Sequence, residues 1–344
     1  MKTRLAFTFS LMLTSFGSLT IAGDSTDGKA FSTCRVVPFH GFDKSIEITR
    51  GPARVVLCPQ VGGRVLEFSV DGKNVLWLDE KEKSWKPGDP VDATAGRFDY
   101  GPELTTISHP TLWSGEWSGE ITGPYSAKLT SQKDPAAGIQ LVRDFQLAGS
   151  GSDGAIAPFH LVCKQTIHNV SREIREVCHW GRSFSPGGGI CLIPLGDRPS
   201  RFPSKYAMYE DSAIINVRNA DDKIRVRDGF VEILSAPRKP KLGLDATAGW
   251  LGYLTPSNTL FIKRFATFPD RVYNEAAGLT ISVWYPTGPR VELEPIGPRE
   301  RLQPGESASC TEDWWLLPFP FPVQGQKVDL KTLDTFVKEQ ILTP

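Results

Sequence analysis

Two glutamates on one strand are the residues of this 344-residue chain best suited to acid–base chemistry. Apolar and polar side chains alternate from Arg290 to Pro295, which predicts a strand with two different faces. Val291 and Leu293 share one face, and Glu292 and Glu294 share the other. Two carboxylates on an apolar-backed strand form either a solvated outer face or the floor of a site.

A second group of candidates combines aromatic rings with charged side chains. Trp113 offers a flat apolar surface on which the C–H face of a sugar can stack. Arg97, Asp99 and His109 precede it and supply groups that can bond sugar hydroxyls. The alternative is that Trp113 and Trp117 only cap a sandwich core.

Two further polar residues lie in apolar segments. His179 is either an acid in a site or a strand histidine bonded to a backbone carbonyl. Lys241 either reaches a sugar or lies in solvent, as most lysines do. The histidines and cysteines lack metal-ligand spacing, so the sequence predicts neither a metal nor a cofactor.

The elements that position these residues are strands joined by tight turns. The Asp71-Gly72 pair between two apolar runs predicts a type I′ hairpin. The 32 glycines and 27 prolines are spread along the chain without a linker of low complexity, which favours one large all-β domain over residues 24–325. Residues 326–344 are predicted to form a helix docked on the sandwich, since four apolar residues fall on one helical stripe: Leu330, Leu333, Phe336 and Val337.

Several of these segments resemble one known family. Leu293-Glu294-Pro295, followed by a Leu-x-Pro-Gly-Glu turn and a Glu-x-Trp strand, resembles the C-terminal end of the aldose 1-epimerase, or galactose mutarotase-like, proteins. The Gly-Gly-Arg strand that leads into the Asp71-Gly72 turn is similar to the opening hairpin of that family. The resemblance is nearest to an exported branch of unassigned function, and it implies an antiparallel β-supersandwich.

The resemblance also implies a function and roles for the candidates. Glu294 matches the general base of the family, and His179 or His109 is the candidate acid. An aldose 1-epimerase uses such a pair to open the sugar ring and close it from the other face. The alternatives are a non-catalytic carbohydrate-binding module and a structural or partner-binding exported protein. The residues expected to contact the sugar are Arg97, Asp99, Trp113, Lys241 and Glu292.

Composition and the N-terminus restrict the setting in which the protein acts. Lys and Arg total 39, as do Asp and Glu, so no net field favours nucleic acid as a partner. Met1 to Gly23 has the basic start, apolar run and Thr-x-Ala end of a secretory signal, which predicts a secreted or periplasmic protein. No apolar run has the length of a membrane span. The sequence carries no feature that specifies an oligomeric state.

Six cysteines in an exported chain are either disulfide-bonded or buried free thiols. The turn at Asn169-Val170-Ser171 joins two predicted strands, and a hairpin there would bring Cys163 close to Cys178. The sequence therefore predicts that Cys163 and Cys178 lie close together, while the disulfide connectivity stays open.

Overall fold

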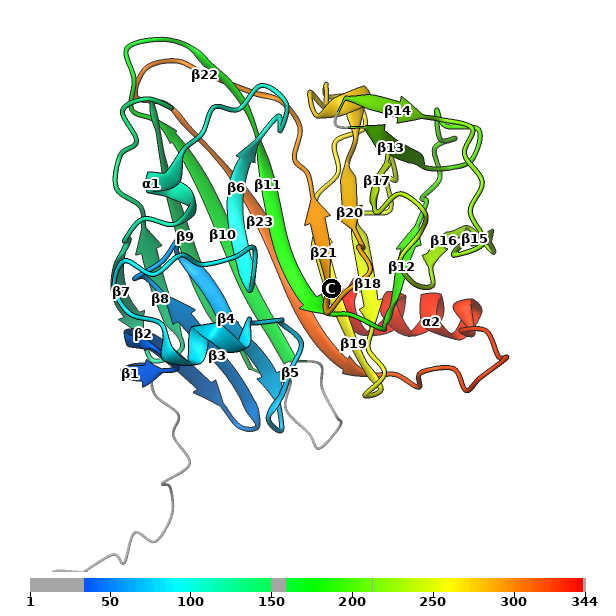
Figure 1. Ribbon diagram of the computed structural model, residues 1–344, viewed down its shortest axis with the longest axis horizontal. Coiled ribbons are helices and arrows are strands. Elements are labelled where there is room, and N and C mark those ends of the chain that lie inside the picture. Colours follow the sequence, from blue (N-terminus) through cyan, green and yellow to red (C-terminus); the bar gives the residue numbers. More distant parts are fainter. Residues whose placement is uncertain (1–33, 150–158, 212, 343–344) are drawn as a thin grey trace, which may run out of the picture. The chain divides into compact units, whose positions relative to one another are not determined.

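Two antiparallel sheets make up the protein in the computed structural model, which describes residues 34–149, 159–211 and 213–342 (Figure 1). The predicted all-β supersandwich with a short C-terminal helix is confirmed. The predicted signal segment, residues 1–23, lies outside the described residues. None of the helices in the described ranges is long and apolar enough to cross a membrane.

The first sheet has 13 strands, and its main path begins at β1 near the start of the described chain and ends at β14. In spatial order the path is β1 (Arg35–Phe39), β2 (Phe42–Arg50), β3 (Ala53–Cys58), β4 (Arg64–Val70), β6 (Gly96–Gly101), β11 (Arg175–Pro186), β21 (Arg290–Pro295), β20 (Ile281–Trp284), β17 (Lys241–Leu244), β13 (Ala207–Asp211) and β14 (Ile214–Asn216). Off this path, β5 (Lys73–Asn74) pairs with β4 and β22 (Glu300–Leu302) pairs with β11.

The second sheet has 10 strands. In spatial order they are β15 (Ile224–Arg227), β16 (Phe230–Ile233), β12 (Ile190–Pro194), β18 (Trp250–Leu254), β19 (Thr259–Phe265), β23 (Ser307–Pro318), β10 (Phe159–Asn169), β9 (Ile139–Ala148), β8 (Ser126–Thr130) and β7 (Ser118–Gly123). The helical segments are η1 (Glu80–Ser84), α1 (Pro110–Trp113), η2 (Ala276–Gly278), α2 (Leu330–Val337) and η3 (Lys338–Leu342).

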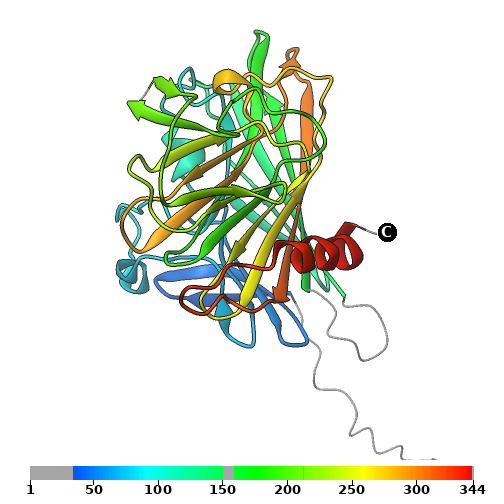
Figure 2. The ribbon, with the colours of Figure 1, turned by 90° about the vertical axis from the view of Figure 1, so that its right-hand side faces the viewer.

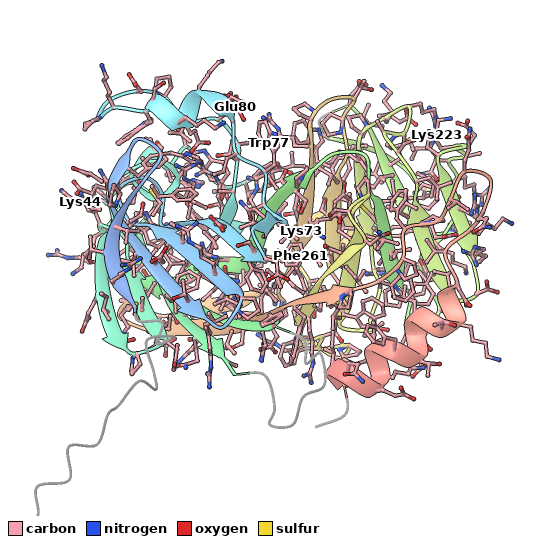
Figure 3. All side chains as sticks on the ribbon, turned by 90° about the horizontal axis from the view of Figure 1, so that it is seen from below. Lys44, Lys73, Trp77, Glu80, Lys223 and Phe261 are labelled. Carbon is pink, nitrogen blue, oxygen red and sulfur yellow. The ribbon has the colours of Figure 1, made fainter. Side chains whose placement is uncertain are left out.

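The apolar core lies between the two sheets. Phe261 of β19 lies in the interior (Figure 3), with its ring 6.3 Å from the ring of Phe68 on β4 and 5.5 Å from that of Trp314 on β23. The inward-facing Val291 and Leu293 of β21 belong to the same core and are fully buried. The opposite face of β21 therefore points away from the second sheet.

The predicted Asp71-Gly72 hairpin is confirmed. It joins β4 to β5, with Val70 opposite Lys73. Asp71 has a φ of 50° and Gly72 a φ of 74°, and both are positive, as a type I′ turn requires. This turn fixes which residues of β4 face the core.

The C-terminal helix packs on the outer face of the second sheet. Leu330, Leu333 and Val337 of α2 are buried in one cluster with Trp250 and Leu317, and Figures 1 and 2 show the helix beside β18 and β19. Asp329 caps the helix, since its carboxylate accepts a hydrogen bond from the backbone N–H of Thr332 at 3.0 Å. The predicted apolar stripe is thus the buried one, with Phe336 at its partly buried margin.

The predicted proximity of Cys163 and Cys178 is wrong. The turn after Asn169 does not make a hairpin, because it leads from β10 in the second sheet to β11 in the first. Cys163 lies opposite Phe145 and Glu312, whereas Cys178 lies opposite Gly101. All six cysteines, each within the described ranges, are free thiols.

Candidate functional site

Five neighbouring strands of the first sheet carry the candidate residues on the face that points away from the second sheet. These strands are β6, β11, β21, β20 and β17, which lie side by side in Figure 1. The register aligns the candidates across the strands, because residues directly opposite each other share a face. Trp284 lies opposite both Glu292 and Lys241, and Arg182 lies opposite Arg97. Side chains from distant parts of the sequence thus form one polar row.

Glu294 is completely buried within this row. Its carboxylate accepts hydrogen bonds from Lys241 Nζ at 2.9 and 2.8 Å and from Trp180 Nε1 at 2.9 Å. Burial raises the pKa of Glu294, but the charges of Lys241 and Arg182 outweigh it and lower that pKa to about 2. Glu294 is therefore held as an anion at neutral pH.

Glu292 lies two residues earlier on the same face, in a different environment. Arg182 Nε donates to its Oε1 at 2.7 Å. Burial raises the pKa of Glu292 to about 7, and the negative charge of Glu294 adds to the rise, although Arg182 opposes it. Two adjacent carboxylates with pKa values pushed apart in this way are a pattern found at acid–base sites.

A cavity of about 570 Å³ opens onto this face, and we call it the central cavity. Its polar lining includes Glu292, Arg182 and Lys241, while Trp284 and Tyr209 contribute aromatic surface. Glu294 is fully buried, is bonded to Lys241 and does not line the cavity. Among the carboxylates and amines of the polar row, Glu292 and Lys241 are the ones that line this cavity. Its full lining is Ala93, Glu103, Leu104, Arg182, Tyr209, Glu210, Asp211, Lys239, Pro240, Lys241, Trp284 and Glu292.

His109 and Asp99 support this row from one end. His109 Nε2 donates to Asp99 Oδ1 at 2.8 Å, and His109 Nδ1 donates to the carbonyl of Ile107 at 2.6 Å. Burial lowers the pKa of His109, but the hydrogen bond and charge of Asp99 outweigh it, so the net shift is upward. Asp99 Oδ2 lies 3.5 Å from Arg182 Nη1. His109 therefore reaches the site indirectly, through Asp99 and Arg182.

Arg97 and Trp113 form a support beside the cavity. The buried Arg97 guanidinium donates to the backbone carbonyls of Thr94, Trp113 and Asp92, at 3.1, 2.6 and 3.0 Å. It lies 4.1 Å from the Trp113 ring centre, and the Arg182 guanidinium lies 4.8 Å from the same ring. Arg97 is thus engaged in holding loops, and Trp113 is half-buried against Arg182.

His179 lies on the opposite face of β11 from Trp180 and Arg182. Its Nε2 bonds the carbonyl of Ala308 at 3.1 Å, and its ring stacks on Phe98 with 5.9 Å between centres. Burial lowers the pKa of His179 to about 4. The structure therefore does not bring His179 together with Glu294, and the alternative of a carbonyl-bonded strand histidine describes its position.

The side chain that stands beside Glu294 is Trp180, one residue after His179. Neither Trp180 nor Arg182 was among the candidates from the sequence. Trp180 and Arg182 share a face of β11 with Phe184, which lies opposite Glu292. This period-two pattern could have identified both residues as part of the site if the pairing of β11 with β21 had been known. Within the described residues, no group of three His, Cys, Asp or Glu side chains is arranged to hold a metal ion.

Solved structures with the same fold cover most of the chain. A galactose mutarotase-like protein from Clostridium acetobutylicum superposes with a TM-score of 0.55 at 14% identity, over 80% of this chain and 96% of that one. A galactose mutarotase-like protein from Lactobacillus casei ATCC 334 gives a TM-score of 0.55 at 9% identity, over 79% of this chain and 100% of that one. The Slr1438 protein from Synechocystis sp. PCC 6803 gives a TM-score of 0.55 at 15% identity, over 85% of this chain and 99% of that one.

These likenesses define the class of fold. The chain folds as a galactose mutarotase-like β-supersandwich, in agreement with the resemblance in its sequence motifs. No family model and no curated protein matches the sequence. At identities of 15% or lower, the likeness shows the fold, and the function has to be argued from the site itself.

Proposed function

We propose that the central cavity binds a carbohydrate and interconverts its anomers by acid–base ring opening, as an aldose 1-epimerase does. The observation that carries this proposal is the pair of buried carboxylates with opposite pKa shifts, one of which lines the cavity beside a lysine. The fold class supports the same reading, since its members include galactose mutarotase-like proteins.

In this proposal Glu292 and Lys241 carry the proton transfers. Glu292 in its ionised form takes the proton of the anomeric hydroxyl, and the Lys241 ammonium gives a proton to the ring oxygen as the ring C–O bond breaks. The open-chain aldehyde rotates about its C1–C2 bond. The ring oxygen then returns its proton to Lys241 while Glu292 gives its proton back to the new hydroxyl. Every proton is restored at the end of the cycle.

Glu294 has a supporting role in this scheme. Its anion lies 2.8 Å from Lys241 Nζ and stabilises the ammonium form, which raises the pKa of Lys241 despite burial. This assignment differs from the one implied by the sequence resemblance, in which Glu294 is the base. The assignment rests on which carboxylate a ligand can reach, because Glu292 lines the central cavity whereas Glu294 is fully buried and does not.

Polarimetry on freshly dissolved α-anomers of glucose and galactose tests the proposal. The wild type is expected to accelerate mutarotation, and Glu292→Gln to lose about two orders of magnitude, the usual scale for removing a general base. Glu294→Gln keeps a cavity-facing base and is expected to lose less. A larger loss in Glu294→Gln would return the role of base to Glu294.

A non-catalytic carbohydrate-binding protein is the second candidate. The pairing of Glu292 with Arg182 at 2.7 Å favours it, since a carboxylate engaged by a guanidinium is a weaker base. Calorimetry distinguishes the candidates, because this alternative predicts sugar binding with no acceleration of mutarotation. Absence of binding by any sugar at millimolar concentration would contradict both.

A further inference from the structure

A second cavity is lined by residues that neighbour those of the central cavity, and we call it the loop cavity. Its volume is about 620 Å³, and the segment from Trp85 to Val91 forms one side of it. Trp113 and Glu116, at and beyond the end of α1, form part of the other side. The loop cavity is thus as large as the central one and is built from different strands and loops.

One side-chain contact connects the linings of the two cavities. Trp113 lines the loop cavity, and its ring centre lies 4.8 Å from the guanidinium of Arg182, which lines the central cavity. Val91 lines the loop cavity and Ala93 the central one, so the same short segment borders both. Arg97 holds Trp113 and this segment together, because its guanidinium donates hydrogen bonds to the backbone carbonyls of Trp113 and Asp92.

The lining of the loop cavity has the chemistry of a sugar site. Trp113 offers a flat ring, and Gln60 and Ser114 offer uncharged polar groups. Lys44 and Glu116 face each other at 3.4 Å with 64% and 59% of their side chains exposed. Such an exposed pair contributes little to stability, so a ligand can displace it at little cost.

We infer that the two cavities are neighbouring subsites for one oligosaccharide, with Trp113 as the stacking surface between them. This inference rests on the proposed carbohydrate function of the central cavity. Ring opening requires a free anomeric hydroxyl, so the reducing-end residue occupies the central cavity beside Glu292. The next sugar residue, attached through a non-anomeric oxygen, extends past Trp113 into the loop cavity. The substrate class is therefore a reducing oligosaccharide of neutral sugars.

Calorimetry on the full chain tests the inference with glucose, galactose, and α-1,4- and β-1,4-linked glucose oligomers of two to four units. The readout is the ratio of the monosaccharide Kd to the oligosaccharide Kd within each variant, so a defect that weakens all sugars equally leaves it unchanged. The wild type is expected to show a ratio of about 10 or more for one linkage, the equivalent of 1.4 kcal/mol.

Two variants address the loop cavity and one serves as control. Lys44→Ala with Glu116→Ala removes polar groups, and Ser114→Trp fills the space; each is expected to reduce the ratio at least threefold. Lys128 and Asp144 form a comparable pair at 3.4 Å on β8 and β9, with 41% of each side chain exposed, and replacing both by Ala is expected to leave the ratio unchanged.

The possible outcomes separate the two proposals. A wild-type ratio near one for every linkage, with monosaccharide binding intact, would overturn the subsite inference and leave the proposed function standing. A high ratio that survives in both loop-cavity variants would also overturn it. Binding of no sugar of any length would overturn the proposed function, and the subsite inference with it.

Discussion

The ion pair between Lys241 and Glu294 gives a stability prediction that needs no ligand. Both side chains are largely buried, and Lys241 Nζ lies 2.8 Å from the Glu294 carboxylate. Replacing Lys241 by Met keeps an apolar stem of similar length and leaves the Glu294 anion without its closest cation. Removing one partner of a buried pair typically costs about 3–5 kcal/mol. Because Arg182 and the Trp180 indole remain near Glu294, we expect about 3 kcal/mol at pH 7.

The pH dependence of this loss follows from the pKa of Glu294. In the wild type that pKa is lowered, so the carboxylate stabilises the fold above its unfolded pKa, and this stability is lost as pH falls through about 2. In Lys241→Met, burial is no longer offset by Lys241, so the pKa of Glu294 rises and the native state takes up a proton on acidification. The stability difference between wild type and variant should therefore shrink between pH 7 and pH 4.

Urea unfolding at pH 7, 5.5 and 4 measures this difference. Lys241→Met with Glu294→Gln is the matched control, because it removes the charge together with its partner and should recover most of the lost free energy. A loss below about 1 kcal/mol at pH 7, in the range of exposed pairs, would refute the description of this pair as buried and energetically coupled. A loss that does not change with pH would refute the proposed rise in the pKa of Glu294.

Three further predictions concern other parts of the chain. Trp113→Ala should weaken carbohydrate binding by about 1–3 kcal/mol, because it removes a stacking surface; unchanged affinity in calorimetry would contradict this. His109→Gln should cost more stability at pH 6 than at pH 9, because the raised pKa of His109 gives stability that is present below its unfolded pKa and lost as pH rises through the folded one; equal urea midpoints for the two proteins at both pH values would count against the Asp99 contact. Mass spectrometry of the exported protein should find a mature N-terminus near Gly23 or Asp24, and an intact Met1 would end the export hypothesis.

Local patterns predicted the fold and the carboxylate face of the site. The Asp71-Gly72 turn and the alternation in β21 are short-range signals, because turn chemistry and period two are decided within a few residues. They were enough to place Glu292 and Glu294 on one face. The partners of these carboxylates could not be predicted in the same way, since Arg182 and Lys241 reach them from strands far away in the sequence.

The position of His179 shows where sequence alternation fails. Residues Val177 to Gly181 of β11 are all buried, because one face of the strand packs on the second sheet and the other is covered by the site. A strand buried on both faces has no polar–apolar alternation to reveal its orientation. A shift of one residue in the expected register exchanges the faces, and so Trp180 rather than His179 stands beside Glu294. The Cys163–Cys178 prediction failed for a related reason, since a turn between sheets and a hairpin turn look alike in sequence.

The surroundings of Glu292 in the polar row explain why the pKa of this carboxylate lies near neutrality. Asp99 pairs with His109 and Arg182, and Glu294 pairs with Lys241, at 2.8 to 3.5 Å. The exposed Glu103, 3.7 Å from Lys241, supplies a third anion at the mouth of the cavity. Burial disfavours the ionised form of Glu292, and the neighbouring Glu294 anion disfavours it further, against the opposing charges of Arg182 and Lys241. The pKa of Glu292 rises toward neutrality for this reason, so a carboxylate that lines the central cavity can release and take back its proton near pH 7.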